Sequence, residues 1–241
     1  MKSKLHIFLF TILFLGLSCG DDGEDDVIVI PEADRNEQQV IDNDSLLGYL
    51  QTHYINSSFL INNQNISLDE IFINSLSVDG VLPEPDVNTL LIDLVETHTT
   101  TYSDTDYEYY VLKLNQGGGE NTPNFSDKVR VSYEGNLMDA TVFDSSYSPA
   151  DFDLTATIAG WGRVLPEFNN AIDFNVNGDG TITFNDPGIG VMFLPSGLGY
   201  YSSAAGTVPV YSNLIFKFKV FQSEENDHDF DLSLIHISEP T

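Results

Sequence analysis

The chain carries very little positive charge. Its 241 residues include 9 Lys and Arg against 37 Asp and Glu, which gives a formal net charge of −28 at pH 7. Binding to nucleic acid depends on Lys and Arg that neutralise phosphates, and attachment to anionic lipid by charge has the same requirement. Both functions are therefore disfavoured. The acidity is typical of a soluble protein in an extracytoplasmic or salty environment.

Cysteine is also nearly absent. Cys19 is the single cysteine, so no disulfide can form within the chain. It directly follows Met1–Ser18, in which Lys2 and Lys4 precede the apolar run Ile7–Leu17. That run is too short for a comfortable permanent membrane span, so residues 1–18 are predicted to be a targeting segment.

The position of Cys19 resembles the lipobox of bacterial lipoproteins, although Gly16 stands where leucine is usual. The resemblance implies cleavage before Cys19 and lipidation of its sulfur. The acidic run GDDGEDD, Gly20–Asp26, resembles the surface-export signals of Bacteroidetes-type lipoproteins, or is a plain spacer. We expect an outer-membrane lipoprotein of the bacterial cell envelope, facing the periplasm or the surface. An ordinary secretory peptide with an incidental cysteine is the alternative.

Metal ligands are sparse. The five histidines are scattered, so the sequence predicts neither a metal constellation nor a cofactor. The segment Asp173–Gly188 places Asp179 and Asp186 in a pattern similar to a calcium-binding loop. A tight hairpin at Asn177–Gly180 explains the same residues without an ion, so calcium is not expected there.

Alternating apolar residues dominate the C-terminal half. Apolar residues make up 41% of the chain, which is enough for a core. Val129–Tyr133 and Leu214–Phe218 alternate with a period of two, which predicts half-buried antiparallel strands. Leu165, Phe168 and Ile172 predict one short helix over 164–172, with Pro166 in its first turn.

The N-terminal half is less regular. Apolar residues on one face predict a helix over Arg35–Tyr54, and Asp42–Asp44 is a candidate interruption that acts as a cap. Asn56–Val95 contains short apolar pieces between breakers, which favours an accessory region packed against the C-terminal domain. Tyr107–Leu114 is predicted to be the first strand of the main sheet.

Several motifs occur in one order along the C-terminal half. They are VSYEG (131–135), VFDSS (142–146), FDLTATIAGW (152–161), PSGLGYY (195–201), VPV (208–210) and NLIFKFKV (213–220). Their order and spacing resemble the FKBP-type peptidyl-prolyl cis-trans isomerases. The resemblance implies an α+β fold, in which a curved antiparallel β-sheet wraps around one short helix.

The family's functional residues carry over position by position. The resemblance implies the catalytic residues Tyr133, Phe143, Asp144 and Tyr200. It implies the substrate-binding residues Phe152, Thr157, Ile158, Trp161, Val208 and Phe216. In this scheme the aromatic rings seat a proline, Tyr200 and the Ile158 N–H donate to substrate carbonyls, and Asp144 orients the twisted carbonyl. The alternative is that the aromatic residues are simply core.

Three positions depart from the family pattern. Thr157 replaces valine, Val210 replaces the second loop proline, and Tyr201 replaces the glycine after Tyr200. These changes bear on turnover more than on fold. The expected partners are proline-containing polypeptides, which the domain would isomerise during folding of exported proteins. The rival function is a non-catalytic binding module, in which the same residues recognise a proline-containing segment within an envelope or motility complex. The lipoprotein subgroup that the chain most resembles includes gliding-motility-associated members.

The predicted organisation has five parts. They are a signal peptide (1–18), an acidic tether (19–34), an accessory region (35–105), an FKBP-type domain (106–222) and an acidic tail (223–241). Within the tail, Leu232–Thr241 resembles the translation of a sequencing-library adapter and is left out of the fold prediction.

Overall fold

The computed structural model describes residues 32–226, which belong to one compact unit. The predicted signal peptide, the lipidation site at Cys19 and the adapter-like residues 232–241 lie outside the described residues. Among the helices of residues 32–226, none combines the length and the apolar composition that a membrane crossing requires.

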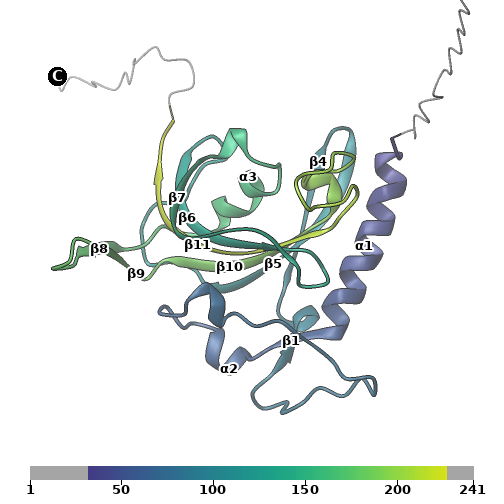
Figure 1. Ribbon diagram of the computed structural model, residues 1–241, viewed down its shortest axis with the longest axis horizontal. Coiled ribbons are helices and arrows are strands. Elements are labelled where there is room, and N and C mark those ends of the chain that lie inside the picture. Colours follow the sequence, from purple (N-terminus) through teal and green to yellow (C-terminus); the bar gives the residue numbers. More distant parts are fainter. Residues whose placement is uncertain (1–31, 227–241) are drawn as a thin grey trace, which may run out of the picture. The chain divides into compact units, whose positions relative to one another are not determined.

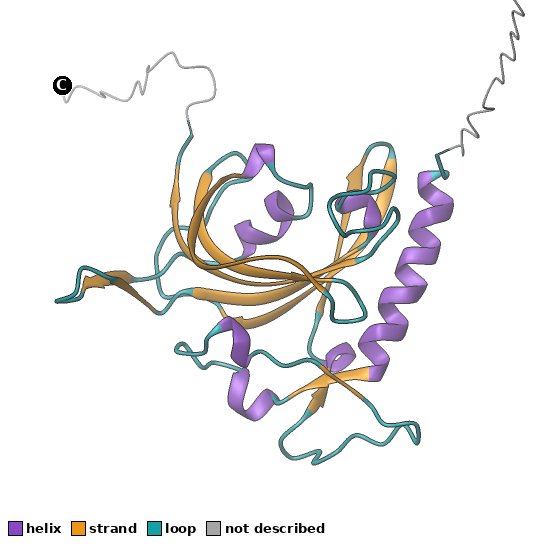
Figure 2. Ribbon diagram, in the orientation of Figure 1, coloured by secondary structure: helices purple, strands orange, loops and turns teal. Residues whose placement is uncertain are grey.

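One antiparallel sheet of six strands organises the C-terminal part. Its strands run in the order β4-β5-β10-β11-β6-β7. Figure 1 labels these strands, and Figure 2 shows the strands of the fold in orange. Their bounds are β4 Glu96–Tyr102, β5 Thr105–Asn115, β6 Lys128–Asn136, β7 Val142–Asp153, β10 Gly188–Leu194 and β11 Leu214–Glu224. Figure 1 shows this sheet curled around a short helix, α3. The predicted fold class, a curved antiparallel sheet around one helix, is confirmed. The sheet also contains β4, which pairs with β5 and comes before the strand that was predicted to be first.

The helix inside the curl lies earlier than predicted. α3 covers Trp161–Val164, and a 3-10 turn, η4, follows at Leu165–Glu167. Pro166 has no N–H and its ring obstructs the preceding turn, so the α-helix cannot continue through it. Phe168 is extended, with φ −115° and ψ 145°, and Ile172 is 60% exposed. The predicted helix over 164–172 is therefore wrong in its bounds.

The central strands, among them β6 and β11, are largely buried on both faces, whereas the edge strands β4 and β7 are mostly exposed. The prediction that Val129–Tyr133 and Leu214–Phe218 are half-buried is therefore wrong. In β11, Phe216 and Phe218 face the core that contains α3, whereas Ile215 faces a second core and is 1% exposed. The second face also carries Lys217 and Lys219, which extend polar groups from that side. The accessory region covers this face and supplies most of the second core.

The accessory region contains a helix and a small sheet. Its elements are α1 Arg35–Thr52, β1 His53–Ile55, α2 Ser57–Leu60, η1 Leu68–Glu70, β2 Asn74–Ser75, β3 Thr89–Leu90 and η2 Leu91–Asp93. The three strands pair in the order β2-β1-β3. Lys219 of β11 donates to the Ile66 carbonyl at 2.8 Å, which joins this region to the main sheet.

Helix α1 is continuous, so the expected interruption at Asp42–Asp44 is wrong. Its N-cap is Asp34, whose side chain accepts from the N–H groups of Asn36 and Glu37. Asp42 is 2% exposed, and its Oδ2 accepts from the Ser196 N–H at 2.8 Å and from the Ser196 hydroxyl at 2.6 Å. The Asp42 carboxylate therefore accepts hydrogen bonds from a distant part of the chain and does not cap the helix.

We expect Asp42→Asn to change how stability depends on pH. Burial raises the pKa of Asp42 above 3.8, although its hydrogen bonds with Ser196 and Gln38 oppose the shift. A raised pKa means that the folded protein favours the protonated, neutral form of Asp42. The stability that this protonated form contributes is complete below pH 3.8 and is lost as pH rises through the folded pKa. An amide stays neutral at every pH and can still accept from Ser196.

The free energy of unfolding of Asp42→Asn relative to the natural protein should therefore increase from acid to neutral pH in urea titrations. Asp44→Asn, an exposed position on the same helix, is the control. Parallel pH profiles for the natural protein and Asp42→Asn would contradict the assignment.

Candidate active site

Three aromatic rings from three separate elements meet inside the curl of the main sheet. Tyr133 comes from β6, Phe216 from β11 and Trp161 from the start of α3. The Trp161 ring lies 5.1 Å from Phe216 and 5.8 Å from Tyr133 between centroids. β6 and β11 are neighbouring strands, so their alternate residues bring the two rings to the same face. Tilted and edge-on pairs at these separations attract one another.

Two further rings from β7 border this group. Phe143 meets Phe216 edge-on at 5.4 Å, and Phe152 lies 5.3 Å from Tyr133 and 6.0 Å from Trp161. Both β7 rings are half-buried, whereas the other three are at most 8% exposed. We call these five rings the aromatic cluster. Its members are Tyr133, Phe143, Phe152, Trp161 and Phe216.

The loops beside the cluster contribute three more of the predicted residues. Ile158 and Tyr200 are half-buried and pack against the same core, and Val208 is 2% exposed within it. Ala205 and Val208 each donate a backbone N–H to the other's carbonyl, which closes the tip of the loop that carries Val208. The structure therefore brings together residues that are up to 83 positions apart, from Tyr133 to Phe216.

A polar pair lies at the edge of the cluster. The Tyr133 hydroxyl donates to Asp144 Oδ2 at 2.6 Å, while the Asp144 residue itself is exposed. Burial and the Asp144 carboxylate both raise the pKa of Tyr133, so its hydroxyl keeps its proton at neutral pH. Burial, followed by the charge of Asp144, also raises the pKa of Tyr200. Tyr200 is therefore available as a hydrogen-bond donor.

Local backbone hydrogen bonds hold the chain on both sides of Ile158. η3, Leu154–Ala156, precedes it, and the Ile158 carbonyl accepts from the Trp161 N–H at 3.2 Å. Within residues 32–226, no acceptor is recorded for the Ile158 N–H. This group can donate to a ligand, as the predicted role requires.

Thr157 makes its recorded hydrogen bonds within its own loop. Its hydroxyl donates to the Leu154 carbonyl at 2.8 Å, which satisfies it locally. The residue lines a different hollow, together with Thr100, Phe125 and Arg163. The role of Thr157 in substrate binding therefore stays a prediction.

Tyr201, which replaces a family glycine, has the backbone conformation that glycine favours. Its φ is +51°, in the left-handed region. Its hydroxyl donates to the Ala33 carbonyl, and the Arg35 guanidinium lies 3.9 Å from its ring centroid. Contacts with the N-terminal segment thus offset the backbone cost and fix the loop that carries Tyr200.

One group of titratable side chains was missed in the sequence. His98 lies between Glu167, 3.2 Å from its Nδ1, and Glu96, 3.6 Å from its Nε2. Ligand atoms of these three residues lie within 4.8 Å of one another, so they could hold a metal ion. The Lys113 ammonium lies 3.8 Å from the Glu96 carboxylate, so Glu96 already has a positively charged partner within the protein. The group spans β4 and η4, which sequence spacing gave no reason to join.

The calcium-like segment forms the alternative hairpin. β8, Asp173–Val176, pairs with β9, Ile182–Asn185. Asp179 accepts from the Thr181 N–H and hydroxyl in the turn, whereas Asp186 accepts from the Asn115 amide at 2.7 Å. The two carboxylates therefore have separate structural roles.

Gly135 should not tolerate a side chain. A Cβ at this position would lie 2.7 Å from Phe143 Cζ and 2.8 Å from Phe216 Cε1. We expect Gly135→Ala to displace these rings and lower the free energy of unfolding by about 1–3 kcal/mol. Gly178→Ala is the matched control, because a Cβ there meets nothing within 4 Å. Equal denaturation midpoints for both variants would contradict the packing.

Comparison with known proteins agrees with this arrangement. Residues 119–221 match the model of the family described as FKBP-type peptidyl-prolyl cis-trans isomerase. The chain is 46% identical over 61 residues to the peptidyl-prolyl cis-trans isomerase Mip of Coxiella burnetii, covering 24% of this chain and 25% of that protein. It is 31% identical over 134 residues to FkpA of Aeromonas hydrophila, covering 54% of this chain and 42% of that protein.

A third similar protein is the FKBP-type 22 kDa peptidyl-prolyl cis-trans isomerase of Escherichia coli. The identity is 33% over 113 residues, covering 45% of this chain and 47% of that protein. The chain thus spans less than half the length of each of these relatives. All of the predicted catalytic and substrate-binding residues fall inside the segment that the family model matches. Residues 119–221, which contain the aromatic cluster, therefore match the FKBP-type peptidyl-prolyl cis-trans isomerase family.

Proposed function

We propose that this protein is a peptidyl-prolyl cis-trans isomerase. The observation that carries the proposal is the aromatic cluster with the Tyr133–Asp144 pair at its edge. Buried rings of Tyr133, Trp161 and Phe216 provide an apolar surface, and half-buried Phe143 and Phe152 leave it accessible from outside.

The chemistry needs no nucleophile. Rotation about an Xaa-Pro bond breaks amide resonance, with a barrier of ~18–20 kcal/mol for peptide bonds in general. A twisted amide has lost resonance and is less polar than the planar one. An apolar, water-poor surface therefore binds the twisted amide better than the planar amide, and this preference lowers the barrier.

The polar groups select the orientation of the substrate. The proline ring would pack on Trp161, while Tyr200 and the Ile158 N–H donate to substrate carbonyls. Tyr133 holds Asp144 through a 2.6 Å hydrogen bond, which fixes the carboxylate beside the rotating carbonyl. The packing of Ile158 and Tyr200 against the core that contains the cluster supports these roles.

The finer proposals concern place and clients. We propose that the protein is lipidated on Cys19 and works on proline-containing segments of exported proteins in the bacterial cell envelope, as a lipoprotein of the Bacteroidetes type. The lipobox-like sequence and the acidic run after it support this proposal. A non-catalytic binding module that uses the same aromatic cluster is the second candidate.

Asp144→Ala should reduce the rate more than the binding. A hydrogen bond to a charged group contributes about 1.5–3 kcal/mol, and we expect its loss to lower kcat/KM about 10- to 100-fold. The assay is protease-coupled isomerisation of a short proline peptide. Trp161 is the only tryptophan, so its fluorescence reports peptide binding in the same samples. Tyr133→Phe, which keeps the ring and loses the hydroxyl, should reproduce part of the effect.

Asp151→Ala is the matched control, because this carboxylate lies on the same strand but pairs with Arg130 at the surface. Peptide binding without any acceleration by the natural protein would favour the binding module. An Asp144→Ala variant with full activity would remove Asp144 from the mechanism.

The lipid anchor makes a separate prediction. Cells that express the full chain with a tagged fatty acid in the medium should label the protein, and Cys19→Ser should abolish the label and release the protein from membranes. A labelled Cys19→Ser variant, or an unlabelled natural protein that still sediments with membranes, would contradict lipidation at Cys19.

A further inference from the structure

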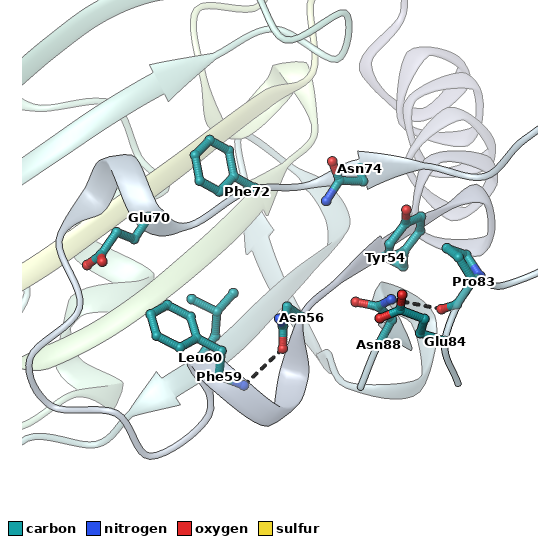
Figure 3. Close-up of a pocket in the computed structure, with 10 residues that line it drawn as sticks. All are labelled: Tyr54, Asn56, Phe59, Leu60, Glu70, Phe72, Asn74, Pro83, Glu84 and Asn88. Carbon is teal, nitrogen blue, oxygen red and sulfur yellow. Dashed lines mark hydrogen bonds between the residues drawn. The ribbon is translucent and has the colours of Figure 1, made fainter. Parts of the chain in front are cut away.

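The accessory region contains an open groove that the isomerase proposal does not use. It lies between the segment Glu70–Asn74 and helix α2, with Tyr54 of β1 at its base and Pro83–Asn88 at one end (Figure 3). Its volume is about 550 Å³. Grooves of this size accept a ligand or one or two side chains.

Exposed aromatic rings line this groove. Phe72 is 65% exposed and Phe59 is 45% exposed, and Figure 3 shows them on opposite sides of the hollow, with Leu60 beside Phe59. Leu60 is only 1% exposed, so it anchors the floor in the second core. Exposing two phenyl rings to water beside one hollow is costly, and such surfaces are typical of binding sites.

The walls of the groove are fixed before any ligand arrives. The Asn56 side-chain oxygen accepts from the Phe59 N–H at 3.0 Å, which caps helix α2. At the other end the Asn88 amide donates to the Pro83 carbonyl at 2.8 Å. Both hydrogen bonds are drawn in Figure 3. A preformed groove binds with little cost in conformational entropy.

The charge of the groove is negative. Glu70 lies near the end formed by Phe59 and Phe72, and Glu84 lies at the end formed by Pro83 (Figure 3). The residues that line the groove include no Lys or Arg, and the whole chain has a net charge of −28. Phosphates and acidic peptides are therefore repelled, and a ligand with cationic groups is favoured.

We propose that this groove binds an extended segment of unfolded polypeptide in which an aromatic or aliphatic side chain is flanked by Lys or Arg. The apolar side chain would lie between Phe59 and Phe72, and the cationic groups would reach Glu70 and Glu84. Asn74, on the rim, carries an amide that matches peptide groups in donor and acceptor capacity. Glu70 already interacts with Lys219 and accepts from Ser67. The second cationic group would therefore pair mainly with Glu84, which a neutral glycan would leave without a cationic partner.

This inference extends the proposed function, because a client held at the groove keeps its prolines at a raised local concentration around the isomerase site. The two sites lie on opposite faces of the main sheet. Leu60 belongs to the core on one face, and Trp161 belongs to the core on the other. A client must therefore be long and unfolded to occupy both sites, and a short proline peptide cannot.

The direct test uses fluorescence anisotropy with the full chain. Two labelled, proline-free peptides share one central phenylalanine, which is flanked by lysines in one and by glutamates in the other. We expect only the lysine peptide to bind, more weakly as salt increases. Phe72→Ala should weaken binding at least about tenfold, as loss of a central aromatic contact does. Glu84→Gln should weaken it several-fold and reduce the salt dependence.

Phe125→Ala is the matched control, because Phe125 is 72% exposed and lies outside the groove. Circular dichroism melts of all variants check that they fold. Equal binding of both peptides, or equal affinities of Phe72→Ala and Phe125→Ala, would overturn the proposal. Binding of a neutral oligosaccharide in place of the lysine peptide would also overturn it.

Isomerase assays separate this proposal from the proposed function. Phe72→Ala should keep full activity on a short proline peptide but lose acceleration of the proline-limited refolding of a basic client protein. An inactive natural protein that still binds the lysine peptide would reject the isomerase and keep the groove. Full acceleration of client refolding by Phe72→Ala would reject the groove's role in catalysis.

Discussion

The contact of Trp161 with Tyr133 and Phe216 determines how the rest of the molecule is arranged. These rings come from a helix and two strands, and their centroids lie within 6.4 Å of one another. Burying them together requires the sheet to curl around α3, and the close approach of Gly135 to Phe143 and Phe216 allows β7 to join the curl. The apolar surface of the candidate active site is thus the outer part of the same core that stabilises the domain.

The accessory region affects this site through the loop that follows β10. Asp42 of α1 accepts from both donors of Ser196, and the segment ahead of α1 contacts Tyr201 and Tyr211 through Ala33. Tyr200 lies inside the loop that these contacts hold. The N-terminal half therefore covers the back of the sheet and also fixes a loop on the catalytic side. None of these groups belongs to the aromatic cluster, so in the proposed function the N-terminal half would act on the site only by holding this loop.

Much of the candidate site could be predicted from the sequence, because the motif residues sit on strands whose period of two is visible and whose order matches a known family. The fold class and the gathering of Tyr133, Phe143, Trp161 and Phe216 followed from that pattern. The helix bounds did not, because a single proline at position 166 outweighed the apolar spacing of Phe168 and Ile172.

The remaining differences come from tertiary contacts. Burial of Ile215 on the second face depends on an accessory region whose own sequence carries little periodicity. Asp42 is a helix-breaking candidate in sequence and a buried partner of Ser196 in three dimensions, 154 positions away. The meeting of His98 with Glu96 and Glu167 also depends on the fold alone. The groove around Phe72 was likewise invisible in sequence, since its walls come from short segments that the fold brings together.

The most direct test of the central claim is two-dimensional NMR exchange spectroscopy on a short Xaa-Pro peptide with a small amount of the full chain. Uncatalysed exchange takes tens to hundreds of seconds, too slow for cross-peaks between cis and trans signals. The account predicts cross-peaks that appear with the natural protein and weaken strongly with Asp144→Ala. Slow exchange with the natural protein, despite a change in Trp161 fluorescence that shows the peptide is bound, would contradict it.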